Sequence, residues 1–96
     1  MNISVVIPAY NEENFLPRCL ESLKNQDEPP AEIIVVDNNS KDATAEIARK
    51  YGAKVVSEEQ QGISFARNAG FNAAQYEIIA RCDSDSFLPA DWTKRI

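Results

Sequence analysis

Runs of hydrophobic residues divide the chain into regularly spaced segments separated by polar turns. Four of these runs are short and rich in β-branched residues, as is usual for strands that are buried on both faces of a sheet. They cover residues 3–7, 32–36, 53–57 and 76–82. Pro8 follows the first run directly, and because it has no backbone N–H we expect it to end that strand.

Helical periodicity fills the intervals between these runs. Asn14 is a candidate N-cap for a first helix that begins at Phe15 and repeats leucine at helical spacing. Ser40 is a candidate N-cap for a second helix, which Gly52 is expected to end. A third helix is expected over residues 62–74. Its small residues would permit close packing on a sheet: Ala66, Ala69, Gly70 and Ala73.

The alternation of strands and helices predicts an α/β fold with a parallel sheet, because each crossover is long enough only for parallel pairing. With right-handed crossovers, the sheet is expected to be Rossmann-like, with strand order 3-2-1-4 and helices on both faces. The winding direction then reverses between the first and fourth strands. In folds of this kind, ligands bind in the crevice that opens there at the carboxyl ends of the strands.

Composition narrows the possible functions. The chain has 96 residues, which suits one small domain or part of a larger one, and 44% of them are hydrophobic. Its net charge of −5 argues against nucleic acid as a partner. The absence of histidine excludes imidazole chemistry from this sequence, and neither a GxGxxG nor a GxxxxGK[ST] phosphate-binding motif occurs.

Cys19 and Cys82 lie far apart in the sequence, and we expect both to be buried thiols in a reducing compartment. The N-terminus does not resemble a signal peptide, and no apolar run approaches the ~20 residues needed to span a membrane. We therefore expect a cytoplasmic protein. A longer parent chain could carry membrane segments elsewhere and hold this domain at the inner face of the membrane.

Polar clusters follow three of the four strands, at residues 8–12, 37–40 and 83–85. All three are expected at one edge of the sheet. In extended backbone, Asp83 and Asp85 point to the same side and lie roughly 7 Å apart at their Cα atoms. A hard divalent cation that also binds phosphate oxygens would offset their repulsion. An acidic surface loop is the commoner explanation of an isolated Asp-x-Asp pair, so the inference rests on the convergence of the clusters.

Four segments carry a resemblance to a known family. They are VVIPAYNEE at residues 5–13, IIVVDNNS at 33–40, GISFARNAG at 62–70 and CDSD at 82–85. Their order and spacing resemble those of family 2 glycosyltransferases of the GT-A fold, over essentially the whole chain. The resemblance implies that residues 1–96 are the N-terminal, nucleotide-diphospho-sugar-binding part of such a domain. It also implies that the longer protein transfers a sugar from a UDP- or GDP-sugar donor to an acceptor, with inversion.

The resemblance further implies roles for particular residues in binding the nucleotide. Asp37 would accept a hydrogen bond from the N–H of a uracil or guanine base, and Arg67 would reach the base or the diphosphate. The floor of the nucleotide pocket would be formed by Pro8, Ala9, Tyr10 and Glu12, with the Tyr10 ring facing the base.

The same resemblance implies a role for each of the two acidic residues in the last segment. Asp83 would lie near the ribose, and Asp85 would hold Mg²⁺ or Mn²⁺ against the diphosphate. The cation would act as a Lewis acid and template that neutralises the departing nucleoside diphosphate. Ser84 is expected to act only as a spacer.

Two further expectations follow from what these 96 residues lack. Inverting transfer requires a general base, which the resemblance places beyond residue 96, so the fragment alone is expected to be inactive. The fourth strand is expected to have a free edge with unpaired backbone groups, and this edge favours a homodimer.

Two other kinds of protein are considered. A binding module could hold nucleotide and metal without transferring anything, and a downstream carboxylate would distinguish the enzyme from it. A phospho-receiver domain would need an acceptor aspartate at the end of its third strand. Because that strand ends at Ser57 and Glu58, the receiver is disfavoured.

Overall fold

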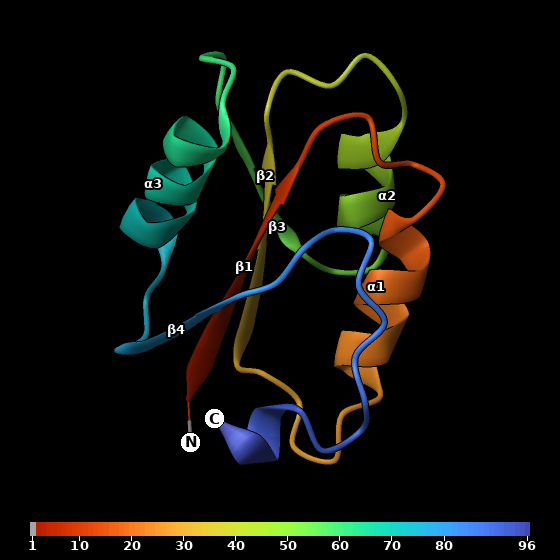
Figure 1. Cartoon of the computed structure of the whole chain (residues 1–96), viewed down its shortest axis with the longest axis vertical. Coiled ribbons are helices and arrows are strands. Elements are labelled where there is room, and N and C mark those ends of the chain that lie inside the picture. Colours follow the sequence, from red (N-terminus) through yellow and green to blue (C-terminus); the bar gives the residue numbers. More distant parts are fainter. Residues whose placement is uncertain (1) are drawn as a thin grey trace.

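The computed structural model describes residues 2–96 and shows a parallel sheet covered by helices on both faces (Figure 1). The strand order is β3-β2-β1-β4, as predicted. No helix within the described residues is long and apolar enough to cross a membrane. The elements in chain order are β1 (Ile3–Ala9), α1 (Leu16–Lys24), β2 (Glu32–Asp37), α2 (Thr44–Lys50), β3 (Lys54–Ser57), α3 (Ile63–Ala73), β4 (Ile78–Arg81) and a 3₁₀ turn (Thr93–Arg95).

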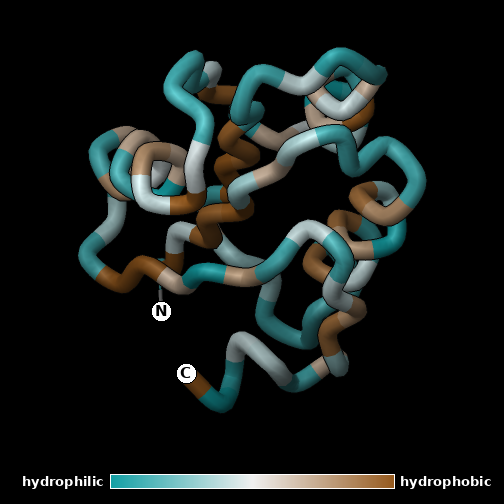
Figure 2. Tube along the Cα trace, turned by 45° about the horizontal axis from the view of Figure 1, so that its top comes forward, coloured by the Kyte–Doolittle hydropathy of each residue, from teal (hydrophilic) through white to brown (hydrophobic). Residues whose placement is uncertain are grey.

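The alternation of side chains along the central strands creates two apolar layers. One layer joins Val5 and Val35 to α1 and α2, and the other joins Val6 and Ile34 to α3. Figure 2 shows the hydrophobic stretches following the strands through the middle of the molecule, with hydrophilic loops at the ends. Because both faces of β1 and β2 are covered, these strands carry almost uninterrupted hydrophobic runs.

The small residues of α3 allow the helix to lie close to the sheet, as predicted. Ala66 and Gly70 are buried against the strands. A Cβ atom placed on Gly70 would come 2.2 Å from Val6 Cγ1, far inside van der Waals contact. The separation between α3 and β1 therefore depends on the absence of a side chain at this position.

The expectation that Pro8 ends the first strand is wrong, because β1 continues to Ala9. The carbonyl of Val6 accepts a hydrogen bond from the N–H of Cys82. The backbone N–H and C=O groups of the even-numbered residues of β1 therefore point towards β4. Pairing with β4 stops at Arg81, opposite Val6. The missing N–H of Pro8 therefore points past the end of β4 and leaves no ladder hydrogen bond unmade.

The predicted starts of the first two helices are also corrected. The first helix begins at Leu16 rather than Phe15, and no side chain caps it, so Asn14 is not its N-cap. The second helix begins at Thr44, whose N–H donates to Asp42 Oδ1. Ser40 does not cap it, because its hydroxyl accepts a hydrogen bond from a different loop. The predicted ends of α2 and α3 agree with the structure to within a residue.

The segment that follows β4 runs back along α1 instead of extending the sheet (Figure 1). Ser22 Oγ accepts the N–H of Leu88, and Gln26 Nε2 donates to the carbonyl of Pro89. Gln26 Oε1 also accepts the N–H of Thr93. Two buried polar side chains, Ser22 in α1 and Gln26 just after it, thus fix the path of the chain after the Asp-Ser-Asp sequence.

Candidate functional site

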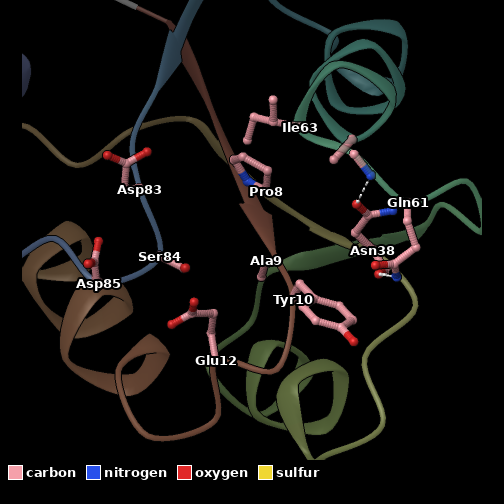
Figure 3. Close-up of a pocket in the computed structure, with 12 residues that line it drawn as sticks. Pro8, Ala9, Tyr10, Glu12, Asn38, Gln61, Ile63, Asp83, Ser84 and Asp85 are labelled. Atoms are coloured by element: carbon pink, nitrogen blue, oxygen red, sulfur yellow. Dashed lines mark hydrogen bonds between the residues drawn. The ribbon is translucent and has the colours of Figure 1, made fainter.

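A cavity of about 470 Å³ opens at the carboxyl ends of β1 and β4, beside the first turn of α3 (Figure 3). The β1–α1 loop forms its floor. The residues after β4 form one wall, and the loop before α3 forms the other. The lining residues are Pro8, Ala9, Tyr10, Glu12, Asn38, Gln61, Gly62, Ile63, Ala66, Asp83, Ser84 and Asp85.

The floor is held in place by the loop that precedes α2. Asn11 has a positive φ of 52°, and its N–H donates to Ser40 Oγ at 2.9 Å. In return, Asn11 Oδ1 accepts the N–H of Lys41 at 2.8 Å. The N–H of Glu12 donates to Thr44 Oγ1 at 2.9 Å. Several polar side chains that the sequence places at this edge therefore accept backbone N–H groups and fix the backbone that carries Tyr10 and Glu12.

The acidic wall is anchored to α1. The Cys19 thiol donates to the carbonyl of Asp83 at 3.5 Å, and its sulfur lies 3.8 Å from that of Cys82. Ser84 is buried, whereas Asp85 is exposed at the mouth of the cavity. Both cysteine side chains are buried, as expected from the sequence. The two carboxylates are thus presented from a backbone that the core holds in position.

The carboxylates of the cavity differ in how their charge is compensated. Asp83 forms a salt bridge with Arg81 at 3.0 Å. Within residues 2–96, no such pair reaches Asp85 or Glu12. Burial and the nearby charge of Asp85 raise the pKa of the Glu12 carboxyl, and the Ser84 hydroxyl offsets this only in part. Figure 3 shows the Glu12 carboxylate directed towards Ser84 and Asp85. Negative charge therefore collects at this end of the cavity.

This arrangement fits a divalent cation that shares its ligands with a phosphate-bearing molecule. No group of three or more Asp, Glu, Cys or His side chains in the described part of the chain is arranged to hold a metal ion by itself. Mg²⁺ is commonly held by one or two carboxylates together with substrate phosphates. Asp85 and Glu12 are the carboxylates of the cavity that could hold such a shared cation.

The structure brings most of the predicted site residues together. Six of the eight line the cavity: Pro8, Ala9, Tyr10, Glu12, Asp83 and Asp85. Asp37 does not line it. Its Oδ1 accepts the N–H of Ser40 at 2.9 Å, and it borders a smaller hollow of about 210 Å³. Arg67 does not line it either, and its half-buried side chain leaves Nε without a hydrogen-bond partner in residues 2–96.

Sequence reasoning missed the remaining lining residues. Gly62 was expected only as a helix boundary, and it enters α3 with φ of 138°, a conformation that favours glycine. Gln61 lies in a polar loop that no sequence pattern distinguishes from other polar loops. The others are Asn38, Ile63, Ala66 and Ser84. Asn38 was noted only as part of a polar cluster, and its contacts depend on a loop twenty residues away.

Comparison with known families gives a match over almost the whole chain. The model described as Glycosyl transferase family 2 matches residues 4–96. The putative glycosyltransferase EpsH of Bacillus subtilis is 38% identical over 99 residues, which cover 98% of this chain and 29% of that protein. Glycosyltransferase AglE of Haloferax volcanii is 37% identical, over 97% of this chain and 33% of its own length. The chain thus spans about a third of the length of these two relatives.

Solved structures agree with this match. S. aureus TarS, residues 1–349, superposes with a TM-score of 0.90 at 34% identity, covering 99% of this chain and 31% of that one. TarS has been solved in complex with UDP and with UDP-GlcNAc. Glucosyl-3-phosphoglycerate synthase from Mycobacterium tuberculosis, solved in complex with Mn²⁺, UDP and glucosyl-3-phosphoglycerate, gives a TM-score of 0.77 at 33% identity, covering 86% of this chain and 33% of that one.

Proposed function

Because this chain belongs to glycosyl transferase family 2 and has the GT-A fold, we propose that its cavity binds the nucleoside diphosphate of a sugar donor. The longer protein would transfer the sugar from that donor to an acceptor hydroxyl, with inversion. Residues 1–96 would be the N-terminal, donor-binding part of the GT-A domain. The general base would be supplied by chain outside these residues.

One observation supports this proposal more strongly than any other. The floor residues Tyr10 and Glu12 and the acidic pair Asp83 and Asp85 come from segments more than 70 residues apart, yet they line the same cavity. The cavity lies where the winding of the sheet reverses, which is the usual position of ligands in folds of this kind. Similar proteins solved with UDP support a nucleotide as the ligand.

We assign the residues to two ends of the bound nucleotide. At one end, the Tyr10 ring would face the base, and Asp37 would accept the base N–H with the oxygen that Ser40 leaves free. Arg67 would contact the base or the diphosphate. Asp83 would lie near the ribose. Since Asp37 and Arg67 lie outside the cavity lining, their roles require that the nucleotide extend beyond the cavity or that their side chains move when it binds.

Asp85 and Glu12 would hold Mg²⁺ or Mn²⁺ at the other end. When bound, the cation would neutralise the charge that develops on the leaving nucleoside diphosphate. The repulsion between Glu12 and Asp85 supports this assignment, because a divalent cation at that position would remove it. A UDP complex containing Mn²⁺ is known for a similar protein, the glucosyl-3-phosphoglycerate synthase.

Isothermal titration of UDP, GDP and CDP, each with and without Mn²⁺, tests the donor site. We expect Mn²⁺ to strengthen binding of the preferred nucleotide, and Asp85→Ala to remove that enhancement and weaken binding about ten- to a hundredfold. Asp27→Ala removes an exposed carboxylate that does not line the cavity and is the matched control. Binding that is indifferent to both Mn²⁺ and Asp85 would contradict the proposal.

Transfer activity is tested separately. The 96-residue chain is expected to bind nucleotide without transferring sugar, since no residue of the cavity is left to activate an acceptor hydroxyl. Incubation with radiolabelled sugar nucleotides and candidate acceptors measures this directly. Sugar transfer by the 96-residue chain would show that the general base lies within it.

We also propose that the chain forms a homodimer through the free edge of β4. In residues 2–96, β4 pairs only with β1, and Ile79 on this strand is 39% exposed. An unpaired strand with an exposed apolar residue is a common site of edge-to-edge association. Light scattering tests this proposal, and a monomer at concentrations near 1 mM would contradict it.

A further inference from the structure

Asn38 uses all of its polar groups to join three parts of the fold. Its backbone N–H donates to the carbonyl of Ala9 at 2.8 Å, at the end of β1. Its side-chain Nδ2 donates to the carbonyls of Glu58 and Gln60 at 2.9 and 2.8 Å. Its Oδ1 accepts the N–H of Gly62 at 3.1 Å. The residue is only 6% exposed, so these hydrogen bonds have little competition from water.

The loop that Asn38 holds forms the wall of the cavity opposite the carboxylates. Gln61 and Gly62 both line the cavity, and Gln61 Nε2 donates back to the carbonyl of Asn38 at 2.7 Å. Gly62 leads directly into α3, whose residues Ile63 and Ala66 complete the wall. One buried side chain therefore sets the distance between the floor of the cavity and this wall.

The two ends of the cavity have independent anchors. In Figure 3, Asn38 and Gln61 lie on the side towards which the Tyr10 ring extends, while Glu12, Ser84 and Asp85 occupy the other side. The carboxylate side is held by α1, through Cys19 and Ser22, and by Thr44 of α2, which accepts the N–H of Glu12. None of these anchors involves the side chain of Asn38. A disturbance at Asn38 should therefore reach one end of a bound nucleotide and spare the other.

We infer that Asn38 is a positioning residue that sets which base the site accepts, by fixing the Gln61–Gly62 wall against the base end of the nucleotide. This inference rests on the proposed nucleotide site. Hydrogen-bonding groups that are rigidly placed discriminate between bases because a mismatched base leaves them unpaired. The amide of Asn38 supplies that rigidity without contacting the nucleotide itself.

Asn38→Asp is the most informative substitution. It keeps the size of the side chain and the acceptor for Gly62, but it replaces both donors with a carboxylate that faces the carbonyls of Glu58 and Gln60. Asn2→Asp is the matched control, because it adds the same charge at an exposed position before β1, at the opposite end of that strand from the cavity.

The experiment measures affinities for UDP, GDP and CDP, with and without Mn²⁺, for the wild type and the variants. We expect Asn38→Asp to bind the preferred nucleotide about ten- to a hundredfold more weakly and to discriminate less between the three. The factor by which Mn²⁺ strengthens binding should not change. Asp85→Ala should show the reverse pattern, with discrimination kept and the Mn²⁺ effect lost. Asn2→Asp should behave as the wild type.

Partial unfolding would weaken the binding of all three nucleotides by the same factor. The ratio of the affinities for UDP, GDP and CDP therefore separates a positioning role from a general structural effect. An unchanged ratio in Asn38→Asp would overturn the inference, as would a wild type that binds all three equally. If circular dichroism shows Asn38→Asp to be unfolded, Asn38→Ser applies the same test without adding charge. A wild type that binds no nucleotide would instead overturn the proposed function, and this inference with it.

Discussion

Gly70 of α3 lies directly against Val6 of β1, so that a Cβ on Gly70 would come 2.2 Å from Val6 Cγ1 and 3.0 Å from Val36 Cγ2. Both valines are fully buried, and the backbone of the sheet behind them cannot easily retreat. The helix that carries one wall of the cavity is therefore held at a distance that only glycine permits.

Gly70→Ala should lower the free energy of unfolding by about 1–3 kcal/mol, because the added methyl group forces the helix and the sheet apart. Urea denaturation followed by circular dichroism measures this change. Val6→Ala removes the atom that the new methyl group would meet. The double variant should therefore lose less stability than the two single variants added together. Additive losses would show that Gly70 and Val6 are not in close contact.

The start of α2 depends on Asp42. Its Oδ1 accepts the N–H and the hydroxyl of Thr44, and its Oδ2 accepts the N–H of Glu13. Asp42→Ala should lower the free energy of unfolding at pH 7 by about 1 kcal/mol, because the groups of Thr44 and Glu13 that donate to this carboxylate lose their acceptor. Asp42→Asn, which keeps one acceptor oxygen, should lose less. A fully stable alanine variant would contradict this role of Asp42.

The effect of Asp42 should also depend on pH. Burial raises the pKa of its carboxyl, but the hydrogen bonds from Thr44 and Glu13 outweigh burial, so the pKa lies below its ordinary value of 3.8. A carboxyl with a lowered pKa stabilises the fold above the ordinary value, and this contribution is lost as the pH falls through the folded-state pKa. The difference between wild type and Asp42→Ala should therefore be full at pH 7 and shrink below about pH 4.

Glu12 should show the opposite dependence. Its pKa is raised by burial and by Asp85, so ionisation destabilises the fold as the pH rises above the ordinary value of about 4.3. Without divalent cation, Glu12→Gln should be more stable than wild type at pH 7, by under about 1 kcal/mol, and equal to it near pH 4. Glu21→Gln, on the exposed side of α1, is the control. A Glu12→Gln variant that is less stable at pH 7 would contradict the charge repulsion.

The sequence was sufficient to predict the topology because each strand carries its own hydrophobic pattern. It was not sufficient to predict that β1 continues through Pro8, because this depends on where β4, about 70 residues later, stops pairing with β1. Ser40 was expected to cap the second helix, and Asn11 was assigned no partner. Instead, Ser40 Oγ and Asn11 Oδ1 each accept a backbone N–H from the other's loop, and neither the spacing nor the residue type reveals such a partner. Gln61 lines the cavity only because Asn38 holds its loop there. Contacts of this kind depend on the packed structure.

Cys82 should resist alkylation in the folded protein. Its sulfur atom lies 3.8 Å from that of Cys19 in the core, and the hydrogen bond with Cys19 together with burial raises the pKa of the Cys82 thiol well above its ordinary range. Because the thiolate is the reactive form, iodoacetamide at pH 8 should leave Cys82 unmodified for as long as the protein stays folded. The same reagent should modify both cysteines in urea, and rapid labelling of folded Cys82 would contradict the packing at this position.

Paramagnetic broadening by Mn²⁺ in the presence of UDP tests the central claim most directly, because it locates the cation in solution. If the cation lies between Glu12 and Asp85, the amide signals of Glu12, Ser84 and Asp85 should broaden first, and Asp85→Ala should abolish the effect. Broadening centred instead on Glu58 and Glu59, which line the smaller hollow, would contradict the account.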